Sequence, residues 1–279
     1  MPEIPAPVPS DLPLTFPNQL ARVAEVMRQQ EPMLRQVAAL YADAIQNGGL
    51  IHVYANGHSR MATEEMVVRM GALTGFHPIM ASALTTFTDV VGSDGLRMCQ
   101  AVEKVEGLGK ILLAEVEVGP HDVFLVLSAT GQTHAAVDFA IEAAKQYPEN
   151  PLVVLASIEQ SKNAAPKHSS GKTLYHVAKE HKKGFHLDNA MPMGDLSTPV
   201  STPVGDFVVC PLSSVGGLTV VQSLNELTVR ELGRRGYKHF ILQNMHLGGY
   251  GVNYDEWLLD QRRRYSRAMC NPNKVEPKL

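Results

Sequence analysis

The sequence predicts a three-layer α/β/α sandwich, built on a five-stranded parallel sheet and preceded by an N-terminal helical element. Three observations support this fold class. Short apolar runs rich in β-branched residues alternate with segments of helical periodicity, two of these runs end in loops rich in Ser, Thr and Gly, and the helical segments are long enough for right-handed crossovers. At 279 residues, the chain is large enough to bury a substantial core.

The N-terminal region is expected to be helical after a proline-rich start. The segment up to Pro17 lacks periodicity, so we expect it to follow the surface or stay mobile. From Asn18 to Asn47, apolar residues recur at helical spacing with Pro32 near the middle, which predicts a helical hairpin or a kinked helix. This amphipathic element either packs on its own domain or forms a dimer interface.

The alternating α/β series follows. Strands are expected over Leu50–Ala55, Phe76–Met80, Asp122–Ser128, Leu152–Ile158 and Phe185–Asp188. Helices are expected over Ser59–Thr74, Thr133–Gln146, Lys172–His181 and Gly217–Arg235. A long insertion spans Ala81–Pro120, and a covering loop or lid is expected around Met191, Pro192, Met193, Pro199 and Pro203. We therefore expect a tail and helical element over 1–47, an α/β domain over 48–245 and a C-terminal extension over 246–279.

Composition and charge are those of an ordinary globular protein. The net charge is −3, with 19% charged and 44% hydrophobic residues, so nothing favours general attraction to nucleic acid. Cys99, Cys210 and Cys270 are far apart, which predicts neither a disulfide framework nor a cysteine zinc site. The chain has no long apolar run, and its first residues are acidic and proline-rich. We expect a cytoplasmic protein with no membrane or nucleic-acid partner.

Two loops carry the main functional signal. Tyr54–Ser59 and Ser128–Thr133 each follow a predicted strand and begin a predicted helix, so both should lie at the carboxyl edge of the sheet. Free backbone N–H groups at a helix start, together with Ser and Thr hydroxyls, suit a phosphate or the hydroxyls of a sugar. Gly57 and Gly131 allow the backbone to turn sharply there. For each loop taken alone, the alternative is an ordinary helix cap.

Three motifs together resemble the sugar isomerase (SIS) domain family. They are the Asn-Gly-His-Ser segment from Asn56, the Ser-Ala-Thr-Gly-Gln-Thr segment from Ser128 and the Ser-Ser-Val-Gly-Gly segment from Ser213. Within this family, the segment from His168 to Tyr175 and the pair Asp188-Asn189 are similar to an uncharacterised subgroup of phosphosugar-binding proteins. The resemblance covers roughly Gly48 to Gly236. It implies a flavodoxin-like sheet, a sugar-phosphate or related sugar-anion ligand, and a cytoplasmic homodimer or homotetramer.

The resemblance also implies roles for individual residues. Phosphate would be held by the hydroxyls of Ser128, Thr130 and Thr133 and by the N–H groups of Gly131 and Gln132. The ligand would also meet Asn56, Gly57, Ser59, Ser213 and Ser214. Thr130 replaces the second serine of the family pattern but keeps a hydroxyl. His58 stands where many relatives have a small residue, and it either narrows the pocket or adds a titrating group.

Aldose–ketose isomerisation through an enediol needs a base, so we considered carboxylates near these loops. Glu64 and Glu65 lie near the start of the helix predicted from Ser59, and we favour Glu65; the alternative is that both complement the helix dipole. Phosphoheptose isomerases place a glutamate further along, where this chain has Val68 and Arg69. The resemblance also makes Glu226 a candidate base, with a solvated helix face as the alternative.

A second group of candidates lies in the segment that begins at His168. This segment places a titratable ring, two hydroxyls and a point charge together, at His168, Ser169, Ser170 and Lys172, which suits contact with the sugar and its phosphate. The ring also makes His168 a further catalytic candidate. The alternative is a helix cap by Ser170. His58, His134 and His168 show no metal-ligand spacing, so we expect no metal and no cofactor.

The leading hypothesis is therefore a sugar phosphate isomerase in which Glu65 moves the proton. A non-catalytic sugar-phosphate sensor is the main alternative, favoured by the missing glutamate of phosphoheptose isomerases and by the insertion at Ala81–Pro120. A sugar-phosphate lyase or etherase, or an amino-sugar deaminase, would use similar acid–base groups.

Overall fold

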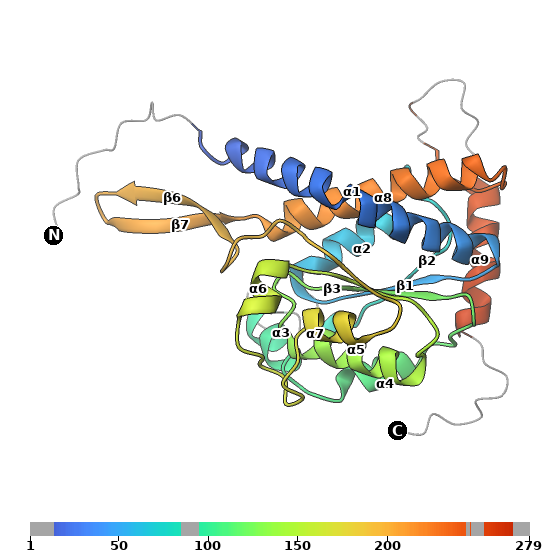
Figure 1. The fold of residues 1–279 in the computed structure, drawn as a ribbon, viewed down its shortest axis with the longest axis horizontal. Coiled ribbons are helices and arrows are strands. Elements are labelled where there is room, and N and C mark those ends of the chain that lie inside the picture. Colours follow the sequence, from blue (N-terminus) through green and yellow to red (C-terminus); the bar gives the residue numbers. More distant parts are fainter. Residues whose placement is uncertain (1–13, 85–94, 244–245, 247–253, 270–279) are drawn as a thin grey trace.

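The computed structural model describes residues 14–84, 95–243, 246 and 254–269. The proline-rich segment through residue 13, part of the predicted insertion and Cys270 lie outside the described residues. The described chain forms a central sheet between two helical layers, which confirms the predicted α/β/α sandwich (Figure 1). A two-stranded hairpin extends from one end of this body.

The main sheet has five parallel strands in the order β2-β1-β3-β4-β5. The strands are β1 (Ile51–Ala55), β2 (Phe76–Ile79), β3 (Val123–Leu127), β4 (Leu152–Leu155) and β5 (Gly184–Leu187). The chain leaves β1 toward β2 on one side and later returns to β3 on the other side. This reversal creates a switch point between β1 and β3, where doubly wound folds open a ligand crevice at the carboxyl ends of the strands.

Successive side chains of each strand point to opposite faces of the sheet, and each face packs in its own hydrophobic core. Ile51 and Val53 pack with α1 (Pro17–Gln46), α2 (Arg60–Val67) and α8 (Ser213–Arg234). Tyr54 and Phe124 pack on the other face with α4 (Leu108–Ala114), α5 (His134–Gln146) and α7 (Leu174–Glu180). Because both faces are covered, the central strands are buried throughout, which explains their nearly continuous apolar sequences.

The N-terminal helix α1 is one continuous helix, so the alternative of a helical hairpin is wrong. Pro32 lies inside it, and buried residues on both sides of Pro32, such as Met27 and Leu34, pack in the same core. Proline removes one helical hydrogen bond, whereas this packing orders both halves of the helix along α8. The helix thus packs on its own domain, which was one of the two predicted roles.

Two predicted helices have different bounds in the structure. The helix expected over Ser59–Thr74 begins with a 3-10 turn, η1 (Gly57–Ser59), and α2 then ends at Val67. Beyond it, the Gly71 N–H donates to the Leu242 carbonyl at 2.7 Å, and the Leu242 N–H donates to the Ala72 carbonyl at 2.9 Å. These tertiary bonds replace further helical ones. The last helix of the series, α8, begins at Ser213, four residues before the predicted start.

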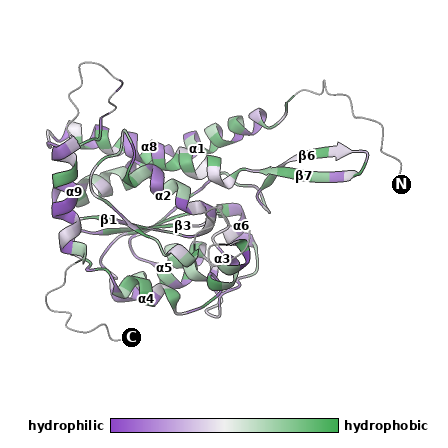
Figure 2. Ribbon diagram, turned by 180° about the vertical axis from the view of Figure 1, so that it is seen from behind, coloured by the Kyte–Doolittle hydropathy of each residue, from purple (hydrophilic) through white to green (hydrophobic). Residues whose placement is uncertain are grey.

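The part of the expected covering loop that contains Pro199 and Pro203 instead forms an antiparallel hairpin of β6 (Leu196–Thr202) and β7 (Gly205–Pro211). Pro199 is tolerated because both strands of a two-stranded ribbon are edges. The hairpin is apolar and projects from the body (Figure 2), with Val204 73% exposed and Phe207 49% exposed.

Further short helices complete the structure. Within the predicted insertion lie η2 (Ser82–Leu84), α3 (Leu96–Val102) and α4, and the unpredicted α6 (Ile158–Asn163) follows β4. The C-terminal helix α9 (Tyr254–Met269) covers the β2 side of the sheet, where Trp257 Nε1 donates to the Ala72 carbonyl at 3.1 Å. In the described part of the chain, no helix combines the length and apolar character needed to span a bilayer.

Candidate functional site

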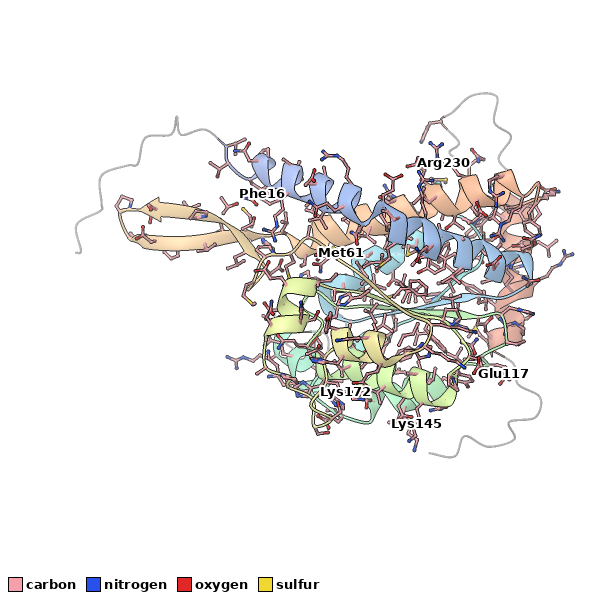
Figure 3. The ribbon with its side chains drawn as sticks, in the orientation of Figure 1. Phe16, Met61, Glu117, Lys145, Lys172 and Arg230 are labelled. Atoms are coloured by element: carbon pink, nitrogen blue, oxygen red, sulfur yellow. The ribbon has the colours of Figure 1, made fainter. Side chains whose placement is uncertain are left out.

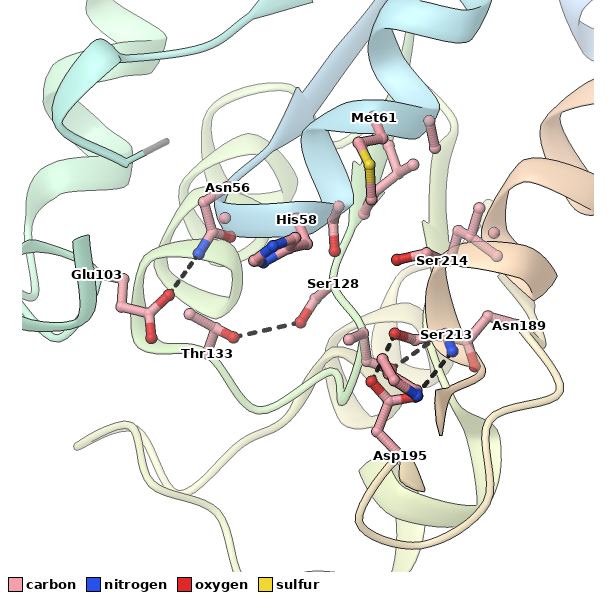
Figure 4. A pocket seen from close by; sticks show the side chains of 18 of the residues that line it. Asn56, His58, Met61, Glu103, Ser128, Thr133, Asn189, Asp195, Ser213 and Ser214 are labelled. Carbon is pink, nitrogen blue, oxygen red and sulfur yellow. Dashed lines mark hydrogen bonds between the residues drawn. The ribbon is translucent and has the colours of Figure 1, made fainter. Parts of the chain in front are cut away.

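A pocket opens at the carboxyl ends of β1 and β3, at the switch point of the sheet (Figure 4). Its volume is about 330 Å³, near the lower end of the usual range for ligand pockets and suited to a small sugar. Its polar lining comes from five places: the loop after β1, the loop after β3, the end of α3, the segment between β5 and β6, and the start of α8. The polar lining residues are Asn56, His58, Ser59, Gln100, Glu103, Ser128, Thr133, Asn189, Asp195, Ser213 and Ser214.

The loop after β1 contributes one wall of the pocket. The pocket is lined by Asn56, Gly57, His58 and Ser59, which the sequence analysis selected as candidate site residues. Gly57 has a φ of +55°, a left-handed conformation that favours glycine and lets the chain turn directly into η1. Asn56 is 6% exposed and its Nδ2 donates to Glu103 Oε2 at 2.8 Å, so this loop is joined to the end of α3.

The loop after β3 forms the floor. Ser128 and Thr133 line the pocket, with their hydroxyl oxygens 3.4 Å apart, and Ser128 Oγ also accepts a hydrogen bond from the Gly131 N–H at 3.1 Å. Gly131 has a φ of +70°, and a Cβ there would lie 2.7 Å from the Cβ of Ser161. Glycine is therefore required, and the loop presents its hydroxyls at the N-terminus of α5, where an anion is favoured.

Three predicted phosphate contacts in this loop, Thr130, Gly131 and Gln132, lie outside the pocket lining, and the Gly131 N–H already donates to Ser128 Oγ. The Gln132 side chain is 3% exposed, donates to the Ala165 carbonyl at 2.8 Å and accepts from Gln160 Nε2 at 2.8 Å. Thr130 Oγ1 accepts the Gln132 N–H at 3.2 Å. The Gln132 side chain thus stabilises the shape of the loop.

The start of α8 closes the other end of the pocket. Ser213 and Ser214 line it, and the Asp195 carboxylate accepts the Leu212 N–H at 3.0 Å, the Ser213 N–H at 2.7 Å and the Ser213 hydroxyl at 2.7 Å. Asp195 therefore caps α8 from the loop before the hairpin. No local sequence pattern signals this role, because Asp195 lies outside the helix that it caps and the whole hairpin lies between them.

Glu103 is the carboxylate at the opposite end of the pocket, and the sequence interpretation missed it. It follows α3 within the insertion, where no strand-to-helix pattern marks a site. Burial raises the pKa of Glu103, and the hydrogen bond from Asn56 opposes that rise. Among the described residues, Asn56 is the side chain that hydrogen-bonds to this carboxylate. A carboxyl group with a raised pKa in a pocket is suited to proton transfer.

The carboxylates selected from the sequence do not line the pocket. Glu65 pairs with Arg69 at 2.7 Å and accepts from Gln222 Nε2 at 2.8 Å, in the seam between α2 and α8. Glu64 pairs with Arg60 on the exposed side of α2. Glu226 pairs with Arg230 at 2.8 Å and its side chain is 61% exposed.

The segment from His168 also lies apart from the lining. His168 Nδ1 is 2.8 Å from the Ser170 hydroxyl, and both the N–H and the hydroxyl of Ser169 donate to the Glu106 carboxylate. Lys172 pairs with Glu180 at 2.5 Å in the layer of α5 and α7, well away from Met61, which lines the pocket (Figure 3).

The described lining of the pocket includes two carboxylates, Glu103 and Asp195, and no lysine or arginine. An anion bound there would depend on the Ser and Thr hydroxyls, because the Gly131 N–H bonds to Ser128 and the Ser213 N–H bonds to Asp195. No group of three or more His, Cys, Asp or Glu side chains in the described ranges is arranged to hold a metal ion.

Comparison with known proteins gives three similarities. The sequence profile of the SIS domain matches residues 15–149. UPF0309 proteins of Geobacillus kaustophilus and Listeria monocytogenes are 27% and 28% identical over 242 and 243 residues, which is 86% of this chain in both cases and 89% and 94% of theirs. A solved phosphoheptose isomerase from Neisseria gonorrhoeae is similar to 77% of this chain and 95% of its own, with 16% identity and a TM-score of 0.47.

Proposed function

The chain is a SIS-domain protein, and on this premise we propose that its pocket binds a sugar phosphate and that Glu103 moves a proton between adjacent carbons of the sugar. The observation that carries the proposal is the pairing of two features in one small pocket. Ser128 and Thr133 stand at the N-terminus of α5, and Glu103 is held beside them by Asn56. The first feature suits a phosphate and the second suits acid–base chemistry.

The reaction class that fits is aldose–ketose isomerisation. An enediol mechanism takes a proton from the carbon beside a carbonyl and returns it to the neighbouring carbon, so one carboxylate can serve both steps. Glu103 supplies that carboxylate, and its burial favours the protonated form that must exist between the two steps. Glu65 is already held by Arg69 and Gln222, so we assign it no part in the reaction.

The test is a thermal-shift panel of phosphorylated aldoses, ketoses and amino sugars, followed by NMR of the products for each hit. A ligand at about 100 times its dissociation constant adds roughly 2.7 kcal/mol to the free energy of unfolding, so binding is readily detected. We expect a sugar monophosphate to bind and to exchange between aldose and ketose forms. Binding without exchange would assign the pocket to a sensor, and release of another product to a lyase or deaminase. Absence of any sugar-phosphate ligand would overturn the proposal.

A further inference from the structure

The starts of η1, α5 and α8 line the pocket. The start of α8 is already hydrogen-bonded to a side-chain carboxylate, that of Asp195. The start of α5 presents Ser128 and Thr133, whereas the start of α8 is capped by the Asp195 carboxylate. In Figure 4, Asp195 and Ser213 lie at one end, Glu103 and Thr133 at the other, and Ser128 between them. The two helix starts therefore differ in their bonding: the start of α8 is hydrogen-bonded to the Asp195 carboxylate, whereas the Glu103 carboxyl at the α5 end is hydrogen-bonded to Asn56.

The backbone conformation at Asp195 places its carboxylate at the start of α8. Asp195 has a φ of +71°, a left-handed conformation that is uncommon for a residue other than glycine and that Asp and Asn tolerate better than most. Its carboxylate accepts three hydrogen bonds, two from Leu212 and Ser213 N–H groups and one from the Ser213 hydroxyl. The Asp195 N–H also donates to the Pro192 carbonyl within the preceding turn, and the Asp195 carbonyl accepts the Leu212 N–H across the base of the hairpin.

We propose that Asp195 makes the pocket selective for sugars that carry a single phosphate. This inference rests on the proposed function, because it takes the α5 end as the phosphate site. A second phosphate on the same sugar would extend toward α8, where Asp195 already satisfies the helix start and adds a negative charge. The lining offers no lysine or arginine among the described residues to offset that charge.

The experiment compares the affinities of a sugar monophosphate and the matching bisphosphate by calorimetric titration of the full chain. Fructose 6-phosphate and fructose 1,6-bisphosphate are the starting pair, replaced by the best monophosphate of the thermal-shift panel and its bisphosphate where another sugar binds more tightly. We expect the wild type to bind the monophosphate at least tenfold more tightly than the bisphosphate.

In Asp195→Asn, which keeps the shape and the tolerance for positive φ, we expect the ratio of the two affinities to fall to within about threefold. Asp206→Asn is the matched control, since it removes the same charge from the exposed tip of the hairpin and should leave the wild-type ratio. If Asp195→Asn does not fold, Asp195→Gly provides the second variant, because glycine accepts the left-handed backbone.

The outcomes separate the two proposals. A monophosphate that binds with the same preference over the bisphosphate in Asp195→Asn, Asp195→Gly and the wild type would overturn the role of Asp195 and leave the proposed function standing. Equal affinities of the wild type for the monophosphate and the bisphosphate would also overturn the role of Asp195 and leave the proposed function standing. A wild type that binds no sugar phosphate would overturn the proposed function, and the inference with it.

Discussion

At the scale of single residues, Glu103 is the group whose surroundings most favour chemistry. It lies in the pocket, its pKa is raised by burial, and Asn56 holds one of its oxygens. We expect Glu103→Gln to lower kcat by at least about 100-fold while the affinity for the sugar phosphate changes only a few fold, because the amide keeps the shape but cannot accept the proton. Steady-state kinetics and titration of the ligand measure both quantities.

The control for this prediction is Glu65→Gln, which should retain wild-type turnover because Glu65 is engaged outside the pocket. The pH profile gives a second check. Since the pKa of Glu103 is raised above the ordinary glutamate value of 4.5, the acidic limb of kcat/KM should lie above that pH, with activity gained as the pH rises through it. Full activity of Glu103→Gln would remove Glu103 from the mechanism, and loss of turnover in Glu65→Gln would contradict the absence of Glu65 from it.

At the scale of elements, the close approach of α8 to the loop after β5 sets the shape of the pocket. A Cβ on Gly216 would lie 1.6 Å from the Asn189 carbonyl oxygen, whereas a Cβ on the next residue, Gly217, would meet nothing within 4 Å. We expect Gly216→Ala to lower the free energy of unfolding by at least about 2 kcal/mol, because α8 must move away from the loop.

Gly217→Ala is the matched substitution one position along the same helix. It should change the free energy of unfolding by no more than about 1 kcal/mol, in the stabilising direction, since alanine has the higher helix propensity. Chemical denaturation of the two variants measures the difference. Equal stabilities would show that α8 does not depend on this close approach.

At the scale of the whole molecule, a buried polar cluster joins the sheet to α9 at the end of the strands away from the pocket. His52 Nδ1 lies 3.0 Å from His77 Nδ1, and His52 Nε2 lies 2.9 Å from Asp122 Oδ2. Arg267 pairs with Asp122 at 2.7 Å. Burial, with a contribution from His52, lowers the pKa of His77 to about 4. His77 therefore favours the neutral form in the folded protein.

This cluster predicts an acid-sensitive fold. Between pH 6.5 and about 4, the unfolded chain binds a proton at His77 that the folded protein does not, so the free energy of unfolding falls as the pH is lowered through this window. We expect the acid-induced loss of unfolding free energy to be smaller in His77→Gln than in the wild type, with a difference of about 2 kcal/mol at most. Burial also lowers the pKa of His186 to about 4. A double variant that replaces both His77 and His186 should therefore lose still less free energy of unfolding on acidification. Denaturation at pH 7 and pH 4.5 compares the variants, and an unchanged loss in His77→Gln would contradict the prediction.

The alternating α/β plan and the two loops after β1 and β3 can be predicted from local sequence patterns alone. Both signals are local: a buried parallel strand needs a continuous apolar run, and a turn from strand to helix needs Gly and residues with hydroxyl or amide side chains at fixed positions. For this reason Asn56, Ser128 and Thr133 were selected as site residues, and the structure brings them into one pocket.

The charged groups that lie beside those loops depend on contacts between distant segments of the chain. Glu103 and Asp195 come from the insertion and from the loop before the hairpin, and they reach the pocket through hydrogen bonds to Asn56 and to the start of α8, across 47 and 18 residues of sequence. Glu65 was a reasonable candidate from its place in α2, but packing of α2 against α8 joined it to Gln222 instead. The burial and the pairing of these carboxylates depend on packing between segments that are distant in sequence. Local periodicity carries no information about that packing.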